Sequence, residues 1–296
     1  MLVWEGYSDP SFASIFEERT GCKVSSAFVG SNDEFAAKLS AGGGGVYDLI
    51  TPSTDTTTIM IKLGLVEPID TSRLPHWNEV FESFRNSPTV NVDGKVWGVI
   101  WDWGSIPMLY RPDKVDPAPT SFSVLWDPKY QGRIAVWDDK SALYMTARML
   151  YGRDTNVYDL SDEQLEEIVA KLIEQKPLVR KYWATMGELI NLYANGEIDV
   201  SNAWEPVTPT LAKQGITVQP FIPDERADGW SDAWMIVKGT KNIDCAYAWI
   251  DFALSPEGQC GNYRVGSYAG TNPEALKTCV TPEEYSALHQ DDPAYL

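Results

Sequence analysis

The stretch YDLITPSTD at residues 47–55 decides the fold class. Residues 47–50 are short and mostly apolar, which is typical of a buried strand. The Pro-Ser-Thr-Asp run that follows is typical of the start of a helix. A buried strand that leads directly into a helix is the repeating unit of an α/β sheet. This stretch therefore predicts an α/β fold, with polar side chains where the strand meets the helix.

The same alternation continues on both sides of this stretch. In the first third we expect strands at 2–4 and 23–29 and helices at 10–19, 32–41 and 56–63. In the middle third we expect strands at 133–137, 199–204 and 218–222 and helices at 141–151, 161–175 and 185–195. Late in the chain we expect a strand at 230–237 and helices at 242–254 and 256–263. This order predicts mostly parallel sheets with helices on both faces.

The length of the chain favours two lobes. The chain has 296 residues, enough for two domains of ordinary size. A proline-rich loop at 112–120 follows the strand-like stretch 97–110, and the apolar strand near 230 looks like a return into the first lobe. We expect lobe 1 to comprise 1–106 and 231–268, and lobe 2 to comprise 107–230 and 269–296.

The composition limits the kinds of partner. There are 42 Asp and Glu against 24 Lys and Arg, a formal net charge of −18. This balance argues against nucleic acid and anionic membranes, which need basic surfaces. It suits a cationic ligand, although acidic composition also serves solubility. No apolar run approaches the ~18 residues of a membrane helix, so we expect no direct membrane insertion.

The cysteines and histidines indicate bridges rather than metal. The four cysteines allow three pairings, which sequence cannot choose between. Cys260 and Cys279, 19 apart in a loop-rich tail, are the pair we favour, and a bridge there would imply an oxidising compartment. Two histidines and no ligand spacing make a zinc site unexpected, and we expect no cofactor. The chain opens on a strand-like stretch, so we expect that a secretory leader has been removed.

The segment GWSDAW at 229–234 carries the clearest binding pattern. Side chains alternate along a strand, so Trp230, Asp232 and Trp234 should share one side. A carboxylate among aromatic faces suits a desolvated cation. The alternative is a core strand whose aspartate caps a turn. By the same alternation we expect Asp102 to face away from its neighbours Trp101 and Trp103, outside the pocket.

Further polar and aromatic residues fall at strand ends or strand-to-helix turns, which are the ligand-binding edges of open α/β sheets. They lie at 4–7, 53–55, 138–139 and 204–205, so we count Glu205 beside Trp204. Trp77, Trp137, Trp183 and Trp249 are interpreted as core or surface residues.

Several segments together resemble a known family. They are WEGY at 4–7, FEERTGCKV at 16–24, the stretch 47–54, LWDPKYQG at 125–132 and the Trp-Ser-Asp pattern at 230–232. The sequence resembles the extracellular solute-binding proteins of ABC importers, specifically the polyamine-binding branch. The resemblance implies a two-lobed venus-flytrap fold with the ligand in the cleft between the lobes, a periplasmic location, a membrane permease as partner and no catalysis. We expect a monomer.

The resemblance also implies a set of ligand contacts. Carried over by motif, these comprise aromatic walls, a hydroxyl contact, an ammonium clamp and an acid from the second lobe: Trp4, Tyr7, Trp103, Trp204 and Tyr268 as walls, Ser53 as the hydroxyl, Trp230 and Asp232 as the clamp, and Asp139 as the acid.

Two departures from the branch keep the ligand open. A glutamate used for a second amine falls near Ala142, which is uncharged, and an aromatic after the Ser-Thr pair is replaced by Asp55. Asp55 is either a second carboxylate of the site or a helix N-cap. The ligand is therefore a polyamine such as putrescine or spermidine, or an omega-amino acid such as 4-aminobutyrate. The latter needs a guanidinium for its carboxylate, for which Arg226 and Arg264 are the candidates.

A function of another class is a carbohydrate-binding protein or glycoside hydrolase, suggested by 12 tryptophans and the pair Asp138-Asp139. Hydrolysis needs two carboxyls about 5–10 Å apart across one bond. Adjacent residues on a strand point to opposite faces, so this pair is poorly suited. No GxSxG motif is present for nucleophilic catalysis. We therefore expect no catalytic residues.

Overall fold

The computed structural model describes residues 1–43 and 45–292. The chain forms two compact units. Unit 1 comprises Met1–Gly104 and the chain from Trp230 on, and unit 2 comprises Ser105–Gly229. The crossings were expected at 106/107 and 230/231 and lie at 104/105 and 229/230, inside the two long strands β7 (Val99–Ile106) and β13 (Asp228–Val237). The predicted α/β fold with two lobes is confirmed.

The tail from residue 269 on was expected in lobe 2, and that expectation is wrong. Strand β14 (Ala269–Gly270) pairs antiparallel with β7, placing Ala269 opposite Trp103 and Gly270 opposite Asp102. A disulfide joins Cys260 to Cys279 and so fixes the segment after β14 to unit 1. The part of this expectation that concerns 293–296 lies outside the described residues.

The sheet of unit 1 has the order β14-β7-β13-β3-β1-β2, with β4 paired to β13. Strand β1 runs parallel to β2 and β3, whereas β13 runs antiparallel to β3 and β4. Its remaining strands are β1 (Leu2–Val3), β2 (Ala27–Phe28), β3 (Leu49–Ile50) and β4 (Val66–Glu67), and a separate hairpin joins β5 (Asn91–Val92) to β6 (Lys95–Val96).

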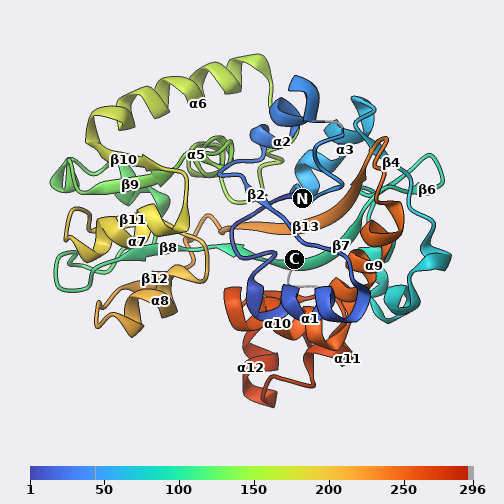
Figure 1. The fold of residues 1–296 in the computed structure, drawn as a ribbon. Coiled ribbons are helices and arrows are strands. Elements are labelled where there is room, and N and C mark those ends of the chain that lie inside the picture. Colours follow the sequence, from blue (N-terminus) through green and yellow to red (C-terminus); the bar gives the residue numbers. More distant parts are fainter. Residues whose placement is uncertain (44, 293–296) are drawn as a thin grey trace. The chain divides into compact units, whose positions relative to one another are not determined.

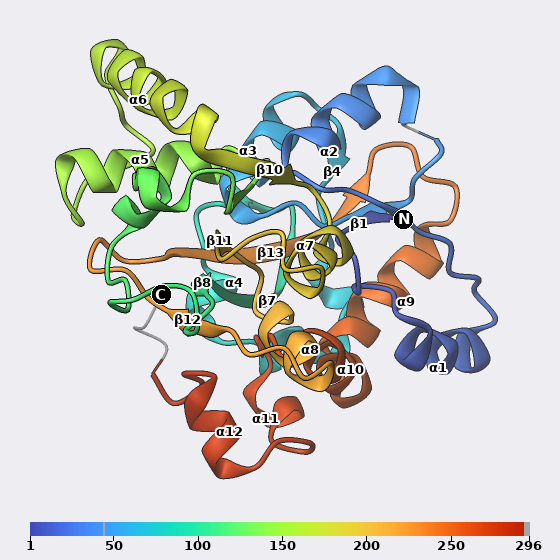
Figure 2. The ribbon, with the colours of Figure 1, turned by 90° about the vertical axis from the view of Figure 1, so that its left-hand side faces the viewer.

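Helices cover both faces of this sheet. In Figures 1 and 2, α1, α9 and α10 gather on one side of β13, and α2 and α3 lie on the other. The buried core includes Trp101, Trp234 and Trp249. The helices of the unit are α1 (Pro10–Thr20), α2 (Asp33–Lys38), α3 (Thr54–Lys62), α4 (Glu82–Arg85), α9 (Ile243–Leu254), α10 (Pro256–Gly266), α11 (Pro273–Leu276) and α12 (Pro282–Ala287), with single turns of other helix types at η1 (Leu39–Gly43), η2 (Thr71–Arg73) and η3 (Pro75–Glu79).

Unit 2 contains a five-stranded sheet of order β10-β9-β11-β8-β12. Strand β9 is parallel to β10 and β11, and β8 is antiparallel to β11 and β12. Its strands are β8 (Met108–Tyr110), β9 (Ile134–Trp137), β10 (Val179–Trp183), β11 (Val200–Asn202) and β12 (Gln219–Phe221). Its helices are α5 (Ser141–Tyr151), α6 (Asp162–Gln175), α7 (Met186–Ala194) and α8 (Val207–Lys213), with 3₁₀ turns at η4 (Phe122–Trp126), η5 (Pro128–Tyr130) and η6 (Lys176–Leu178).

The helices of unit 2 also lie on both faces of its sheet, α5 and α6 on one and α7 and α8 on the other (Figures 1 and 2). The alternation of side chains explains this arrangement. Ile134 and Val136 of β9 join the core cluster that contains Met145 of α5. On the opposite face, the Tyr193 hydroxyl of α7 lies 2.9 Å from the Ser201 hydroxyl of β11.

Both sheets are mixed, so the prediction of mostly parallel sheets holds only for β1–β3 and for β9–β11. Parallel pairing requires a crossover connection, usually a helix, between strands. The chain enters and leaves unit 2 along β7 and β13, which carry no crossover helix at that point. The direction of β7 and β13 in the sheet is therefore set by the passage of the chain between the two units, not by the alternation of strand and helix.

Local signals located the helices better than the strands. The helix expected at 161–175 is α6, and it begins with a capping box, because the Ser161 side chain accepts from the Gln164 N–H while the Gln164 side chain accepts from the Ser161 N–H. Strand β2 is much shorter than the expected 23–29. Strand β10 was not predicted at all, although it pairs with β9 along its length.

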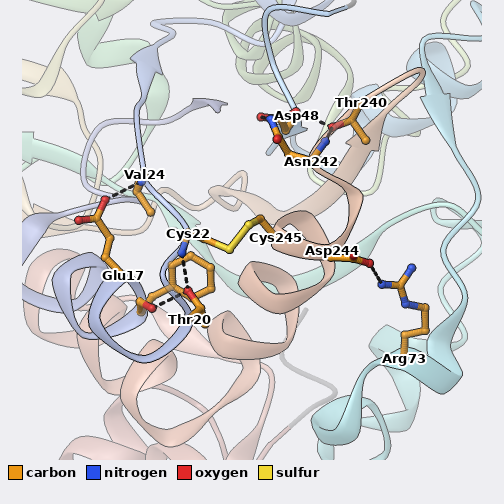
Figure 3. The surroundings of a disulfide bond; sticks show 11 residues. Glu17, Thr20, Cys22, Val24, Asp48, Arg73, Thr240, Asn242, Asp244 and Cys245 are labelled. Carbon is orange, nitrogen blue, oxygen red and sulfur yellow. Dashed lines mark hydrogen bonds and ion pairs between the residues drawn. A yellow bond between two sulfur atoms is a disulfide. The ribbon is translucent and has the colours of Figure 1, made fainter.

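A second disulfide, Cys22–Cys245, joins the loop after α1 to the first turn of α9 (Figure 3). That loop is held by side chains nearby. Glu17 accepts from the Val24 N–H at 2.6 Å, and Thr20 accepts from the Cys22 N–H at 3.2 Å. The favoured bridge Cys260–Cys279 is confirmed, and Cys22 and Cys245 form the other.

Across the described ranges, none of the helices combines the length and the apolar character that crossing a membrane would require.

Candidate amine-binding site

Strand β13 presents a row of three side chains to a row of aromatic rings in unit 1. Trp230 meets Tyr268 edge to face with 5.0 Å between ring centroids, and Trp234 lies 5.3 Å from Trp101. Between them, the Tyr7 hydroxyl donates to Asp232 Oδ2 at 2.5 Å. Trp230, Asp232 and Trp234 thus share one side of the strand, as the alternation predicted.

Tyr7 lies at the centre of this cluster. Its ring packs edge-on against Trp101 at 4.9 Å and against Tyr268 at 6.1 Å. Burial raises the pKa of Tyr7 well above its usual value, and the nearby charges of Asp102 and Asp232 raise it further. Tyr7 therefore stays a neutral hydrogen-bond donor, which holds Asp232 in place.

The turn after β3 places Ser53 beside β13, the strand that carries Asp232. Ser53 forms an isolated antiparallel bridge with Asp232, and its N–H donates to Asn32 Oδ1 at 2.9 Å. Ser53, rather than Asp55, occupies the N-cap of α3, so the N-cap alternative for Asp55 is wrong. Asp55 lies in the first turn of that helix and accepts from the Thr56 hydroxyl at 3.0 Å.

Trp4 and Trp103 pack at other places in unit 1. The Trp4 ring meets Phe35 edge to face at 5.5 Å. Trp103 donates its indole N–H to Gly270 O at 3.0 Å, and its ring lies 6.1 Å from that of Phe84. The Gly270 bond ties β7 to the corner that carries Tyr268. The role of Trp4 and Trp103 as ligand walls stays a prediction.

Unit 2 has an aromatic cluster of its own. Trp137 and Trp183 are stacked, with 5.8 Å between centroids and 18° between planes. The Trp204 ring stands edge-on to both, at 5.4 and 5.2 Å. Trp204 therefore rests on two indoles that had been interpreted only as core or surface residues.

The two acids predicted in unit 2 have local partners. Asp139 Oδ1 accepts from the Ser141 N–H at 2.9 Å, at the start of α5. Glu205 Oε1 accepts from the Ser105 N–H at 2.5 Å, next to the crossing into unit 2. Both bonds hold backbone in place, and a direct ligand contact by either acid stays a prediction.

The alternatives gain little from the geometry. Arg226 is exposed and pairs with Asp154 at 3.5 Å, and Arg264 is exposed on α10. Asp138 is exposed, whereas Asp139 accepts from the Ser141 N–H, so this pair does not present two carboxyls to one bond. In the chain as described, no group of three or more His, Cys, Asp or Glu residues could hold a metal ion.

A cavity of about 540 Å³ lies at the opposite, amino-terminal end of β2 and β3. Its lining includes Phe16, Tyr47, Asp48, Trp249 and the Cys22–Cys245 bridge. None of the predicted ligand contacts lines it. This cavity is thus separate from the Tyr7–Asp232 cluster.

Comparison with known proteins decides the family. A family model described as bacterial extracellular solute-binding protein matches residues 11–295. The chain belongs to this family. Two relatives of this solute-binding protein are each 28% identical to it over 86% of its chain and 72% of theirs: the spermidine/putrescine-binding periplasmic protein of Escherichia coli (strain K12), over 256 residues, and the putrescine-binding periplasmic protein SpuD of Pseudomonas aeruginosa (strain UCBPP-PA14), over 272 residues.

Solved structures agree with the fold of this solute-binding protein. A spermidine/putrescine ABC transporter substrate-binding protein from Streptococcus pneumoniae superposes with a TM-score of 0.74 at 25% sequence identity. The match covers 98% of this chain and 88% of that chain. The predicted resemblance to the solute-binding proteins of ABC importers is confirmed.

The surroundings of three residues of this solute-binding protein could not be predicted from the sequence. Trp137 and Trp183 were interpreted as core or surface residues, and both are buried. The sequence did not predict β10, which carries Trp183. Asp102 was set aside by strand alternation, yet it is fully buried and its charge acts on Tyr7. A useful signal was available, because an aspartate inside an apolar strand is seldom fully buried without a partner or a task.

The solute-binding protein should lose stability at alkaline pH. Burial raises the pKa of Tyr7 in unit 1 and of Tyr193 in unit 2 above the unfolded value of about 10. Unfolded chains therefore release these protons first as the pH rises. The stability of the folded state is unaffected by these groups below about pH 10 and falls above it.

This can be measured as the urea midpoint between about pH 8 and about pH 11. Tyr7→Phe and Tyr193→Phe cannot titrate, so each variant should show a smaller fall than the wild type. Identical falls in all three proteins would contradict the assignment.

Proposed function

We propose that this protein captures a small cationic amine, such as putrescine, spermidine or a related polyamine. The observation that carries the proposal is the Tyr7–Asp232 hydrogen bond within the rings of Trp101, Trp230 and Tyr268. A buried carboxylate attracts an ammonium, and the rings add cation–π attraction while excluding water. The names of the relatives support the same ligand class.

The energetics allow useful affinity. A desolvated cation–π contact contributes about 2 kcal/mol, and a charge-assisted hydrogen bond about 1.5–3 kcal/mol. Three ring contacts and two carboxylate contacts would give about 10 kcal/mol before ordering costs. Micromolar binding corresponds to about 8.2 kcal/mol. The gross contact energy is therefore of the same order as the binding free energy that micromolar affinity needs, before the ordering costs are subtracted.

The wider role follows from the family. We propose that the protein works outside the cytoplasm, in the periplasm, as a monomer without catalytic activity, and delivers its ligand to the membrane permease of an ABC importer. Two disulfides are compatible with an oxidising compartment. The resemblance predicts that both lobes hold one ligand, and this stays a prediction.

The test is a ligand screen by thermal shift, followed by calorimetry on the hits. Putrescine, spermidine, cadaverine, 4-aminobutyrate and a neutral sugar are compared at equal concentration. A ligand that binds only the folded state raises the melting temperature. We expect the polyamines to do so and the sugar to have no effect. A screen in which 4-aminobutyrate alone stabilises the protein would replace the polyamine with the omega-amino acid, and stabilisation by no amine would contradict the proposal.

A further inference from the structure

The Cys22–Cys245 disulfide is accessible from a cavity, and the Cys260–Cys279 disulfide is not accessible from the same one. Cys22 and Cys245 are both half-buried, and both line the cavity of about 540 Å³ at the amino-terminal end of β2 and β3. A thiol of low molecular weight is small enough for a cavity of this volume. Cys260 is only 3% exposed, and neither it nor Cys279 lines this cavity. The two bridges therefore differ in how a reductant can reach them.

The position of Cys245 makes it a good leaving group. Thiol–disulfide exchange needs access to one sulfur and a stable thiolate on the other. Cys245 is the third residue of α9, a helix of 12 residues. The N–H groups of a first helical turn have no partner within the helix, and with the helix dipole they stabilise an anion there. The N-cap residue Asn242 has its side chain turned to Asp48 at 3.2 Å and does not cap this turn (Figure 3).

The charges around the bridge allow an anionic thiolate to approach Cys22. The next residue, Lys23, has a side chain that is 81% exposed, and its ammonium attracts anions to this side. The ionic side chains near the bridge are engaged with partners: Lys23 with Glu17 at 3.3 Å, Arg73 with Asp244 at 2.7 Å, and Asp48 with Thr240 and Asn242 (Figure 3). Cys22 is therefore the sulfur that an incoming thiolate would attack.

Burial protects the Cys260–Cys279 bridge from the same reaction. A thiolate cannot reach Cys260 directly, because this residue is buried in the middle of α10. Cys279 is half-buried, but attack on it would expel the Cys260 thiolate into a buried site. A buried anion without a partner costs free energy that an anion at the start of a helix does not. This bridge should therefore react more slowly.

We propose that Cys22–Cys245 is a thiol-exchange site for small dithiols, and that its reduction weakens unit 1 reversibly while Cys260–Cys279 stays oxidised. One thiolate of the dithiol attacks Cys22 Sγ, the disulfide bond breaks, and Cys245 leaves as a thiolate. The second thiolate then attacks the dithiol sulfur bound to Cys22, which expels the Cys22 thiolate and closes a cyclic disulfide. The dithiol gives up two electrons and two protons, and the bridge becomes two thiols. Reduction thereby removes the covalent link between the loop after α1 and α9.

The test is reduction of the folded protein by dithiothreitol, stopped at intervals with iodoacetamide and followed by peptide mass mapping. We expect Cys22 and Cys245 to be alkylated roughly tenfold faster than Cys260 and Cys279, a ratio that corresponds to a barrier lower by about 1.4 kcal/mol. Protein reduced only at Cys22–Cys245 should unfold at a lower urea concentration. Removal of the reductant in air, without alkylation, should restore the midpoint.

A monothiol reports which sulfur leaves. With 2-mercaptoethanol the first exchange gives a mixed disulfide and one free thiolate, which iodoacetamide traps. We expect the mercaptoethanol adduct on Cys22 and the alkyl group on Cys245. The double variant Cys22→Ser/Cys245→Ser should show no fast alkylation under the same conditions.

Ser25→Trp tests entry through the cavity. Ser25 is exposed and lines the cavity, so an indole at this position narrows it. The variant should slow the alkylation of Cys22 and Cys245 severalfold. Ser123→Trp, the same change at an exposed serine of η4 in unit 2, is the matched control and should react as the wild type does.

Equal rates for the two bridges, or faster reduction of Cys260–Cys279, would overturn the proposal. An adduct on Cys245 would overturn the choice of leaving group, and a wild-type rate in Ser25→Trp would overturn entry through the cavity. An unchanged urea midpoint after selective reduction would contradict the effect on unit 1. Each measurement uses protein without added amine, so the outcome is independent of the proposed amine binding.

Discussion

Asp232→Asn should lose amine binding almost completely, with the Kd for putrescine rising roughly 100-fold. Removing one partner of a buried charge pair costs about 2–5 kcal/mol, and about 1.4 kcal/mol is tenfold in affinity. The asparagine can still accept from the Tyr7 hydroxyl, so the cluster of Trp230, Tyr268 and Tyr7 should keep its arrangement. The measurement is calorimetric titration of purified wild type and variant with putrescine.

Tyr7→Phe separates the charge of Asp232 from its positioning. This variant keeps the ring and the carboxylate but removes the 2.5 Å hydrogen bond. We expect an intermediate loss of affinity, since Asp232 keeps its charge but loses its fixed orientation. If Asp232→Asn bound putrescine as tightly as the wild type, the ammonium clamp on β13 would be wrong, whatever Tyr7→Phe did.

The second large effect concerns the Cys22–Cys245 disulfide. Its cysteines are 223 residues apart in sequence. Replacing both with serine should lower the free energy of unfolding by about 5 kcal/mol, the chain-entropy effect of a loop of that length. The bridge also joins the loop after α1 to α9, two elements that pack together in unit 1. Urea unfolding without reductant gives the difference.

The other bridge provides the comparison. Cys260 and Cys279 are 19 residues apart, so the corresponding double serine variant should lose about 3 kcal/mol. The two variants should therefore rank in the order of their loop lengths. A larger loss for the Cys260–Cys279 variant would show that local packing around α10 and α11, rather than chain entropy, dominates in this protein.

Much of the fold could be predicted because its signals are local. The capping box at Ser161, the apolar strand at 134–137 and the helix starting at Pro10 each depend on a few adjacent residues. The mixed direction of the sheets could not be predicted in this way. It depends on where the chain crosses between units. The tail after residue 268 stays in unit 1 through a pairing with β7 that no local pattern signals.

The same division holds for the candidate site. Alternation along β13 was sufficient to place Trp230, Asp232 and Trp234 on one side. The surroundings of Asp102 could not be predicted, because alternation describes one strand, whereas the side chain of Asp102 accepts from Asn262 of α10. The strand that carries Trp183 was not predicted for a related reason, since it has few apolar residues and is stabilised by pairing with β9.

All four cysteines belong to unit 1, and unit 2 lies between them in sequence, entered along β7 and left along β13. Disulfide formation therefore concerns unit 1 only, and unit 2, which is inserted between the two parts of unit 1, does not need disulfide formation to fold. Residues 105–229 could be exchanged for the same segment of a relative with different ligand preference, and the chimera would keep both covalent links of its host.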